Sequence, residues 1–555
     1  MPTSKRYRRN YVLTVIVVFF LISFLTCFSV NADGTNIFIT FLLAVVFIII
    51  RIKWKIVADE LDIVSNPSDA RWSTEEEFVK LVCPDPNKTD GVWLGGDFYC
   101  TKNVHGVFIG GTGLQKTTTS LIPNLLIKPY SSNFVLDIKP ELAARTARAQ
   151  MEMGQEVYCI DPFGTQSELR TKYGLKDAGF NPFIFLTDEN ELIDNCGIIA
   201  HALIPDKPND KDAYWAERGR TMLKMFLAHI ATAMPKDEKN MYTLYKMLRA
   251  SGDDWINQLI SMKNNPALDG LIQVAAEELL GMADSPATMA SIRSNAQKGT
   301  AIFESPHLRR NLSKNDFNPY DLPAKGNVTV YLILPERYWD DYCTWARMVI
   351  ALSLKACNAK PNNPVQFFFD EFPFLKKFDD VQRNYTFGRG QNIRLWIYAQ
   401  SIAALRENYG TDGMQSFLAN AGIIQCVGGI RDLDTREHFS KLLGNRTRIK
   451  AQKSFGSSSS KDGDSNSTST AYIEEKVPLL TPEQIGNMTG IITLCDRGKV
   501  VLNDTPYFKN RYEGVSLDTP WLTKEDRALL KAGKLPVDET HEYFMKMVDQ
   551  PTRIV

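Results

Sequence analysis

The sequence predicts an α/β protein: a parallel β-sheet domain that is preceded by a transmembrane helical hairpin and interrupted by an all-helical domain. Short apolar segments alternate with helical patterns along much of the chain, which is typical of buried parallel strands connected by helices. Strand signals are absent from residues 214–310, where apolar residues recur at helical spacing instead. Two apolar runs without charged residues precede the alternating elements.

The composition limits the class of protein. A chain of 555 residues is too long for one ordinary domain. Its 64 basic and 64 acidic residues balance, which excludes a generally basic protein that coats nucleic acid but allows a local basic channel. Nine scattered cysteines without a C-x-x-C pair indicate reduced thiols, neither a disulfide framework nor a zinc site.

Residues 1–55 are predicted to form the transmembrane hairpin. Tyr11–Val30 carries no charge over about 20 residues, enough to span a bilayer as a helix, and Ile37–Ile50 is a second, shorter run. Basic residues lie before the first run and after the second. The positive-inside rule therefore predicts that both ends are cytoplasmic and that only the turn NADGTN is outside.

A cleaved signal peptide is the alternative interpretation of the first run, with VNA at Val30–Ala32 as its cleavage site. The run is too long for the hydrophobic region of a signal peptide. We therefore expect a multi-pass membrane protein with most of the chain in the cytoplasm.

The sheet domain is predicted in two parts. Residues 56–105 form a polar connector with short strands, and the first part follows at 106–213, with the strand patterns HGVFIGG, NFVLDIKP and EVYCIDPFG. The all-helical domain, 214–310, separates this part from the next.

The second part of the sheet domain is predicted at 311–520, where the strand patterns NVTVYLILP, VQFFFDEF, IRLWIYAQS and AGIIQCVGG return. Within it, the serine-rich stretch 453–471 has too few apolar residues to pack and is expected to be a flexible loop. Residues 521–555 form a C-terminal tail.

The loop GGTGLQKTTTS joins a predicted strand to a predicted helix. The phosphate-binding pattern G-x-x-x-x-G-K-[ST] fits Gly110, Lys116 and Thr117, but Gln115 stands where the second glycine belongs. In such a loop, backbone N–H groups and the helix dipole bind phosphate, the lysine reaches the β- and γ-phosphates of ATP, and the threonine hydroxyl ligates Mg²⁺. The alternative is a glycine-rich turn that only joins strand to helix. We assign nucleotide contacts to Gly110, Gly111, Thr112, Gly113, Leu114, Gln115, Lys116 and Thr117.

The strand pattern VQFFF supplies the other half of such a site, because it ends in Asp370 and Glu371. Asp370 is expected to hold Mg²⁺, and Glu371 to orient and activate the attacking water. An acidic pair at a strand end is common by itself. A phosphate loop early in the chain and an acidic strand end later, on one α/β sheet, argue against coincidence.

Two further residues are candidates for catalysis. Gln400 follows the strand pattern LWIYA, where a sensor of the γ-phosphate would stand, although a polar residue that ends a strand is an equally good interpretation. Arg389 lies between two glycines before that strand and is expected to reach a neighbouring subunit's site, where it would offset transition-state charge. The alternative for Arg389 is a solvated loop arginine.

The order of these segments resembles TraG-like type IV secretion coupling proteins. The resemblance implies a RecA-like P-loop NTPase domain that uses ATP and Mg²⁺, a cytoplasmic helical domain, a homohexamer around a channel and an inner-membrane location. It also implies as partners the type IV secretion channel components, a relaxase–DNA complex or protein effectors, and single-stranded DNA. The resemblance rests on the segments ARWST, VWLGG, SLIPNLL, LDIKPEL, IDPFG, FNPF, YWAERGRTML, FFFDEFPFL, GRGQNIRLWIYAQS and VPLLTPEQI.

Departures from the family pattern leave two functions open. Leu114 and Gln115 replace a serine and a glycine of the family's phosphate loop, and Pro140 replaces the glycine of D-x-K-G-E-L. We expect nucleotide binding with altered or slowed hydrolysis in an ATP-driven coupling enzyme. The other function is a membrane-bound docking receptor with ATP as a structural ligand. A chromosome-translocating motor is a third option, but the tail is short for the DNA-reading domain that it would need.

The phosphate loop yields a first prediction. If the loop keeps the phosphate-binding arrangement, Gln115 pays about 1–3 kcal/mol for a backbone conformation that suits glycine. Gln115→Gly should therefore bind ATP more tightly, by about tenfold for each 1.4 kcal/mol relieved. Lys116→Ala should abolish transfer. Nucleotide titrations and transfer assays check both variants, and an unchanged affinity together with intact transfer would favour the docking receptor.

Overall fold

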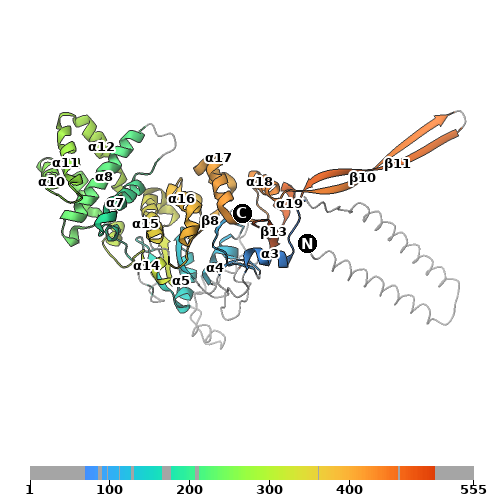
Figure 1. The fold of residues 1–555 in the computed structure, drawn as a ribbon, viewed down its shortest axis with the longest axis horizontal. Coiled ribbons are helices and arrows are strands. Elements are labelled where there is room, and N and C mark those ends of the chain that lie inside the picture. Colours follow the sequence, from blue (N-terminus) through green and yellow to red (C-terminus); the bar gives the residue numbers. More distant parts are fainter. Residues whose placement is uncertain are drawn as a thin grey trace. The chain divides into compact units, whose positions relative to one another are not determined.

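The fold centres on one mixed β-sheet whose strands come from both ends of the described chain (Figure 1). The computed structural model describes residues 69–84, 91–96, 98–111, 113–114, 116–126, 131–165, 175, 177–206, 212–359, 362–460, 463–504 and 506. These form two units. One contains Arg436–Ile485 and the described residues up to Thr74, and the other contains Glu75–Thr435 and the described residues from Gly486 onward.

The predicted membrane hairpin, 1–55, and the predicted tail, 521–555, lie outside the described residues. Within the described ranges, no helix combines the length and the apolar character that crossing a bilayer requires. The membrane topology therefore stays a prediction. The described part of the connector contains a helix and a small antiparallel hairpin: α3 (Glu75–Val82), β1 (Val92–Gly95) and β2 (Phe98–Cys100).

In the described part of the chain, nine strands form the sheet in the order β13-β12-β9-β3-β8-β7-β4-β6-β5. The strands from β9 to β5 are parallel, whereas β12 and β13 pair antiparallel at one edge. Their bounds are β3 (His105–Ile109), β4 (Ser132–Asp137), β5 (Glu156–Ile160), β6 (Val328–Ile333), β7 (Val365–Phe369), β8 (Ile393–Ala399), β9 (Ala421–Val427), β12 (Ile491–Cys495) and β13 (Gly498–Leu502).

The sequence of the central strands explains why they lie inside. Every residue of β3, β4, β6, β7 and β8 is buried. Parallel strands covered on both faces carry near-continuous apolar runs instead of an alternation of apolar and polar residues, and the runs HGVFI, VTVYLI and VQFFF have this character. The predicted parallel sheet is confirmed.

The strand order determines where loops meet. β8 lies between β3 and β7, so the loops that follow these three strands leave the same edge of the sheet side by side. In open parallel sheets, ligands bind beyond the carboxyl ends of the strands. The predicted phosphate loop, the acidic pair and Gln400 follow β3, β7 and β8 respectively.

Helices connect the parallel strands. A π-helical turn, η1 (Thr117–Leu121), precedes α4, in which Pro123 is the second residue. Proline lacks an N–H and its ring collides with the carbonyl four residues back, so the wider turn before it fits the loosening that Pro123 predicts. The other connecting elements are α4 (Ile122–Leu126), α5 (Leu142–Glu152), η2 (Pro182–Phe185), α7 (Glu189–Leu203), α14 (Asp321–Lys325), η6 (Glu336–Tyr338), α15 (Trp339–Ala359), η7 (Phe372–Leu375), α16 (Asp379–Phe387), η8 (Gly388–Gln391), α17 (Ile402–Asn420, kinked at Gly410), α18 (Leu433–Leu443) and α19 (Pro482–Asn487).

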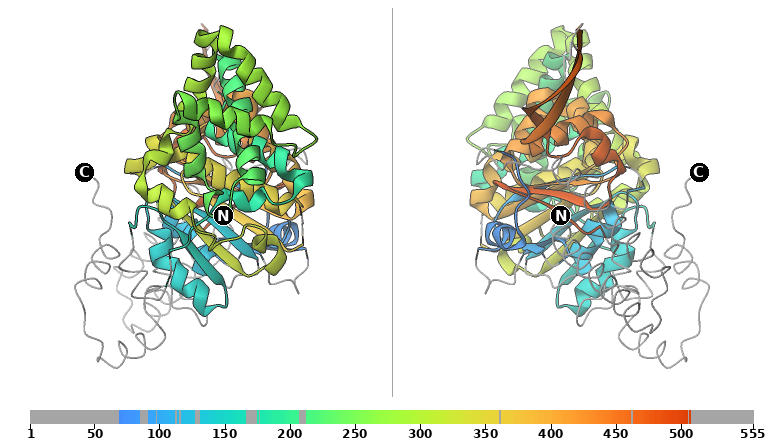
Figure 2. Two further views of the ribbon diagram at one scale, coloured as in Figure 1. Left: turned by 90° about the vertical axis from the view of Figure 1, so that its left-hand side faces the viewer. Right: turned by 90° about the vertical axis from the view of Figure 1, so that its right-hand side faces the viewer.

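The inserted domain is helical from α8 to α13, with no strand among its described residues. Figure 2 shows these helices gathered at one end of their unit, apart from the strands. Their bounds are α8 (Ala213–Ala233), η3 (Lys236–Glu238), α9 (Met241–Arg249), α10 (Asp253–Lys263), α11 (Leu271–Gly281), η4 (Met282–Asp284), α12 (Pro286–Gly299), η5 (Ala301–Glu304) and α13 (Pro306–Leu312).

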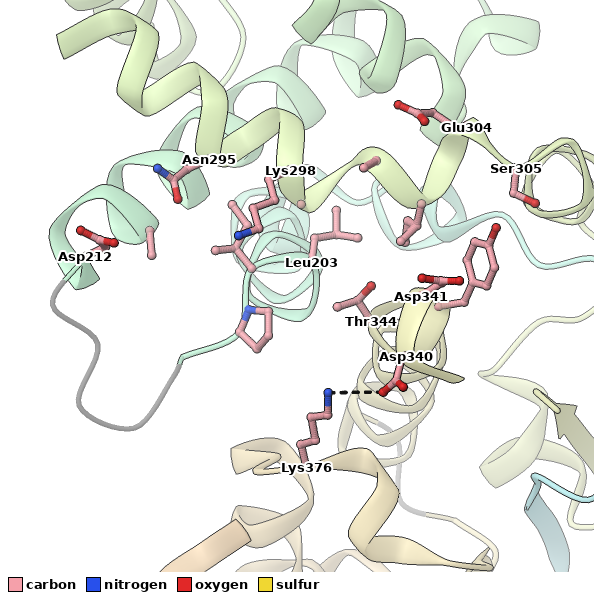
Figure 3. A pocket seen from close by; sticks show the side chains of 17 residues that line it. Leu203, Asp212, Asn295, Lys298, Glu304, Ser305, Asp340, Asp341, Thr344 and Lys376 are labelled. Carbon is pink, nitrogen blue, oxygen red and sulfur yellow. Dashed lines mark ion pairs between the residues drawn. The ribbon is translucent and has the colours of Figure 1, made fainter. Parts of the chain in front are cut away.

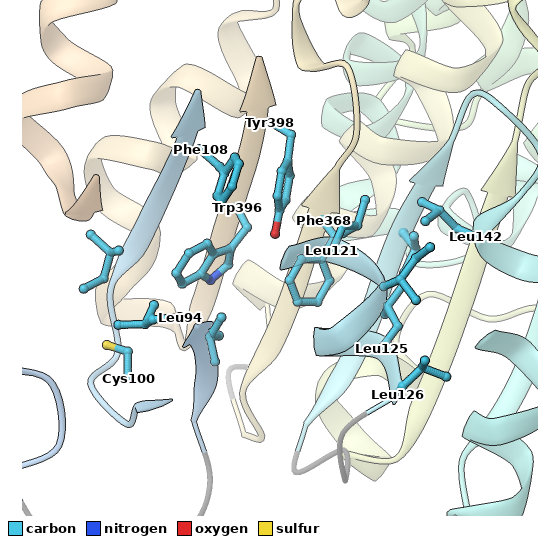
Figure 4. Packing of buried hydrophobic residues seen from close by; sticks show 14 of the residues in the cluster. Leu94, Cys100, Phe108, Leu121, Leu125, Leu126, Leu142, Phe368, Trp396 and Tyr398 are labelled. Atoms are coloured by element: carbon cyan, nitrogen blue, oxygen red, sulfur yellow. The ribbon is translucent and has the colours of Figure 1, made fainter. Parts of the chain in front are cut away.

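The core beside the phosphate loop combines aromatic rings with aliphatic side chains (Figure 4). Phe108 of β3 stacks on Tyr398 of β8 with ring centroids 5.4 Å apart, and Trp396 lies in the same cluster. Leu121 and Leu125, which follow the phosphate loop, belong to the same cluster and are fully buried. Burying a large apolar side chain stabilises a fold by about 1.5–3 kcal/mol, so these leucines hold the helix behind the loop in place.

The serine-rich stretch is not the loop that its composition predicts. β10 (Asn445–Ser460) pairs in antiparallel register with β11 (Gly463–Pro478), so most of 453–471 belongs to a hairpin. The prediction of a loop was wrong because it considered only whether the stretch has enough apolar residues to pack in a core. A two-stranded ribbon instead satisfies backbone groups strand to strand. At the base, Asp69 accepts hydrogen bonds from the backbone N (2.7 Å) and Oγ1 (2.9 Å) of Thr447.

His105 begins β3 and is fully buried. Its Nδ1 accepts a hydrogen bond of 3.0 Å from the backbone N–H of Leu395 in β8, and its ring stacks on Tyr385 at 4.6 Å. Burial, together with the charge of Arg389, lowers the pKa of His105 to about 3. The imidazole is therefore neutral in the folded protein over a range of pH in which an unfolded histidine is charged.

This depressed pKa predicts a loss of stability in acid. Between pH 6.5 and about 3, His105 is protonated in the unfolded chain but not in the folded chain. The free energy of unfolding therefore falls as the pH decreases, by about 2 kcal/mol at pH 5. His105→Asn removes this contribution. Urea unfolding at pH 7 and pH 5 should show a smaller pH-dependent loss for the variant than for the parent. The same substitution at exposed His307 should leave the parent's pH dependence unchanged; equal slopes for all three proteins would contradict the prediction.

Candidate functional site

The loop after β3 needs glycine at two positions. A Cβ at Gly110 would lie 3.0 Å from Cγ2 of Val427 and 3.3 Å from Cβ of Lys116, and Gly113 has a φ of 81°. The backbone N–H of Gly110 donates to the carbonyl of Ala399 in β8 at 3.0 Å, which ties the loop to the neighbouring strand.

The remaining residues of the predicted loop complete the turn. The backbone N–H of Leu114 donates to the carbonyl of Gly111 at 3.1 Å. Thr112 and Gln115 lie outside the described residues, so the consequence of the missing second glycine stays a prediction. Lys116 and Thr117 follow at the start of η1, and both are buried.

Two carboxylates follow β7. Asp370 is 1% exposed; its Oδ1 accepts from the backbone N–H of Glu371 at 3.1 Å, and its Oδ2 has no hydrogen-bond partner within the described residues. Burial, and secondarily the charge of Glu371, raises the pKa of Asp370 to about 6. A buried carboxylate oxygen without a partner is costly unless something else satisfies it. A Mg²⁺ ion would do so, and the Thr117 hydroxyl is also of the oxygen type that Mg²⁺ prefers.

Glu371 is the centre of the site. Nζ of Lys116 lies 2.6 Å from its Oε1, Nζ of Lys139 lies 3.4 Å from the same oxygen, and Nε2 of Gln400 donates to its Oε2 at 3.2 Å. Burial alone would raise the pKa of Glu371, but the charge and hydrogen bond of Lys116, helped by Lys139, hold the pKa below its usual range. Glu371 is therefore a carboxylate that three donors fix in one orientation.

Sequence reasoning missed Lys139 as a site residue, although LDIKPEL contains it. This lysine lies in the turn between β4 and α5. Asp137, at the end of β4, accepts the backbone N–H groups of Glu141 (3.1 Å) and Ala143 (2.9 Å), which fixes the turn. Pro140 has a φ of 25°, a value that suits glycine and strains a proline ring.

Arg389 does not join this cluster within its own chain. It belongs to η8, which precedes β8, whereas Glu371 and Gln400 lie beyond the carboxyl ends of β7 and β8. Its Nε donates to the backbone carbonyl of Asn103 at 3.1 Å, and Nδ2 of Asn103 donates to the carbonyl of Arg389 at 2.7 Å. The predicted contact with a neighbouring subunit stays a prediction.

A cavity of about 740 Å³ lies elsewhere, between the inserted helices and the start of α15 (Figure 3). Asn295 and Lys298 line it from the inserted helices and Asp340 and Asp341 from α15, and Lys376 pairs with Asp340 at 3.8 Å. Neither the phosphate loop nor the acidic pair lines this cavity. Because the convergent polar groups mark the chemistry, the candidate site is the cluster around Glu371 and not the cavity.

Solved structures of similar fold belong to the coupling protein TrwB. A structure of unbound TrwB aligns with a TM-score of 0.59 over 80% of this chain and 96% of that chain, at 16% identity. A second, described as TrwB with ADP and Mg²⁺, aligns with the same score over 82% of this chain and 99% of that one. At this identity the likeness shows the fold: a RecA-like parallel sheet with a helical domain.

Curated relatives are similar in sequence. The coupling protein VirD4 of Bartonella quintana is 25% identical over 360 residues, 62% of this chain and 53% of that protein, so this chain spans about half the length of that relative. The conjugal transfer protein TraG of Escherichia coli is 24% identical over 472 residues, 76% of this chain and 71% of that protein.

The family model described as "Type IV secretory system Conjugative DNA transfer" matches residues 64–499. The match includes the phosphate loop, the inserted helices, the acidic pair and Gln400. This chain therefore belongs to the type IV secretory system conjugative DNA transfer family and resembles its coupling proteins.

Proposed function

We propose that this protein is an inner-membrane coupling ATPase. It recruits a relaxase–DNA complex or protein effectors and delivers them to a type IV secretion channel at the expense of ATP. The observation that carries the proposal is the convergence of Lys116, Asp370, Glu371 and Gln400 on one edge of the sheet, from three different loops. The names of the relatives, conjugal transfer protein and secretion-coupling protein, support the transport role.

The residues of this site can divide the work of phosphoryl transfer. Lys116 binds the phosphates, the Thr117 hydroxyl would ligate Mg²⁺, and Asp370 would hold the ion through water. Mg²⁺, when bound, neutralises charge that develops on the phosphate oxygens. Glu371 orients the attacking water and accepts a proton from it. Gln400, at the end of β8, senses whether the γ-phosphate is present. The TrwB structures described with an ATP analogue and with ADP and Mg²⁺ support this assignment.

The membrane and the assembly belong to the same proposal. Residues 1–55 anchor the chain as a hairpin with both ends in the cytoplasm, and six copies surround a channel that single-stranded DNA can enter. The inserted helices contact the transported substrate, because they interrupt the sheet domain without contributing to the cluster around Glu371. A periplasmic location of the segment after Trp54, measured with reporter fusions, would overturn the topology.

ATP turnover tests the enzymatic part. The purified protein should hydrolyse ATP, and single-stranded DNA should change the rate. Because Glu371 is the proposed general base, Glu371→Gln should lower kcat at least 100-fold while ATP still binds. Glu336→Gln, the same change at an exposed site, should leave turnover intact. A parent that binds ATP without hydrolysing it would favour the docking receptor. The replacement at Leu114 in the phosphate loop agrees with that alternative.

Subunit mixing tests Arg389. Arg389→Ala should lower turnover and keep ATP binding, because the guanidinium acts on a neighbour's nucleotide. Arg389→Ala and Glu371→Gln subunits should each be inactive alone. Mixed oligomers should regain part of the turnover, since an intact Glu371 can then face an intact Arg389. Loss of ATP binding in Arg389→Ala, or mixtures as inactive as the single variants, would assign Arg389 a structural role.

A further inference from the structure

Two lysines share one oxygen of a buried carboxylate, and they are not equivalent. Lys116 lies 2.6 Å from Oε1 of Glu371 and is 5% exposed, whereas Lys139 lies 3.4 Å from the same atom and is 45% exposed. Glu371 itself is 4% exposed. Lys116 is thus enclosed at the bottom of the site, and Lys139 reaches in from its solvent side.

Nucleotide binding changes the balance around Glu371. In the proposed function, Lys116 binds the phosphates, so its contact with Glu371 is lost or weakened. Gln400 then provides only a neutral hydrogen bond. A buried carboxylate that loses its cation is strongly destabilised, and a nearby phosphate of the same sign increases the cost. Mg²⁺ at Asp370 and Thr117 would offset the charge of the phosphates, but the carboxylate of Glu371 still needs a side-chain cation beside it at this stage.

Strand pairing places Lys139 where it can fill this role. β4 and β7 are parallel neighbours, and Leu136 stands opposite Phe369. Lys139 follows three residues after the one, and Glu371 two residues after the other, so both side chains project from adjacent strand ends. The hydrogen bonds of Asp137 hold the turn that carries Lys139. The position of Lys139 therefore depends on the sheet and not on the phosphate loop.

We propose that Lys139 is a positioning residue that becomes the counter-ion of Glu371 when nucleotide draws Lys116 away. It keeps the carboxylate of Glu371 paired and oriented toward the attacking water. The inference rests on the proposed function, because it assumes that Lys116 binds phosphate. In this inference, Lys139 acts on the reaction only by contacting Glu371 and does not contact the nucleotide.

A double-mutant cycle tests this action. The binding of a non-hydrolysable ATP analogue with Mg²⁺ is measured by calorimetry for the full-length protein, Lys139→Met, Glu371→Gln and the double variant. Lys139→Met should weaken binding about tenfold, because Glu371 then loses its last side-chain cation when the analogue binds. In the Glu371→Gln background the same substitution should change binding less than about twofold, because no carboxylate remains to be neutralised.

Control variants separate the alternatives. Lys139→Arg should restore affinity to within about threefold of the parent, since it supplies the charge. Lys102→Met removes a half-buried lysine whose partner is Asp496, at 2.8 Å, and should leave binding unchanged. An equal loss for Lys139→Met in both backgrounds would mean direct contact with the nucleotide and overturn the inference, as would no loss in either. If the parent does not bind the analogue, the proposed function itself is overturned. If the parent binds the analogue and Lys116→Ala does not, the proposed contact between Lys116 and phosphate stands.

Discussion

The buried ion pair between Lys116 and Glu371 joins the two parts of the sheet domain across the helical insertion. One partner starts the helix behind the phosphate loop and the other follows β7, 255 residues later in the chain. Both side chains are almost fully buried, so removing Glu371 would leave the buried charge of Lys116 without its ion-pair partner. The pair therefore requires that β3, β8 and β7 keep their order, because a change of order would separate its members.

The insertion is compatible with this order because of where the chain leaves and re-enters the sheet. β5 is the last strand before the inserted helices and β6 the first after them. Between these strands, Phe180 and Asn315, which precede and follow the inserted helices, form an antiparallel bridge that brings the two chain segments together. An inserted domain whose ends lie close together costs its host little conformational entropy. The helices from α8 to α13 can consequently vary in sequence without disturbing the strands that carry the site.

The sequence predicted the parts of the structure that have a local pattern. Apolar runs such as VQFFF predicted buried parallel strands, and the glycine loop and the acidic pair predicted two of the loops at the site, which the structure brings together through Lys116 and Glu371. Lys139 has no such signal, because a lysine in a turn looks solvated until strand pairing brings it to Glu371. The ribbon of β10 and β11 escaped prediction because backbone pairing leaves no apolar pattern. The strand order, with β6 between β4 and β5, is set by tertiary packing alone.

The ribbon of β10 and β11 has a mechanical consequence. Each strand has 16 residues, and at about 3.4 Å per residue the tip stands roughly 50 Å from the base. The base is held by Asp69 and by hydrogen bonds between Ala70 and Asn445 (2.8 Å) and between Leu479 and Gly444 (2.8 Å). A long arm with a short, fixed root converts small rotations at the root into large displacements at the tip. How far the tip of the ribbon moves therefore depends on a few backbone contacts at Gly444 and Asn445.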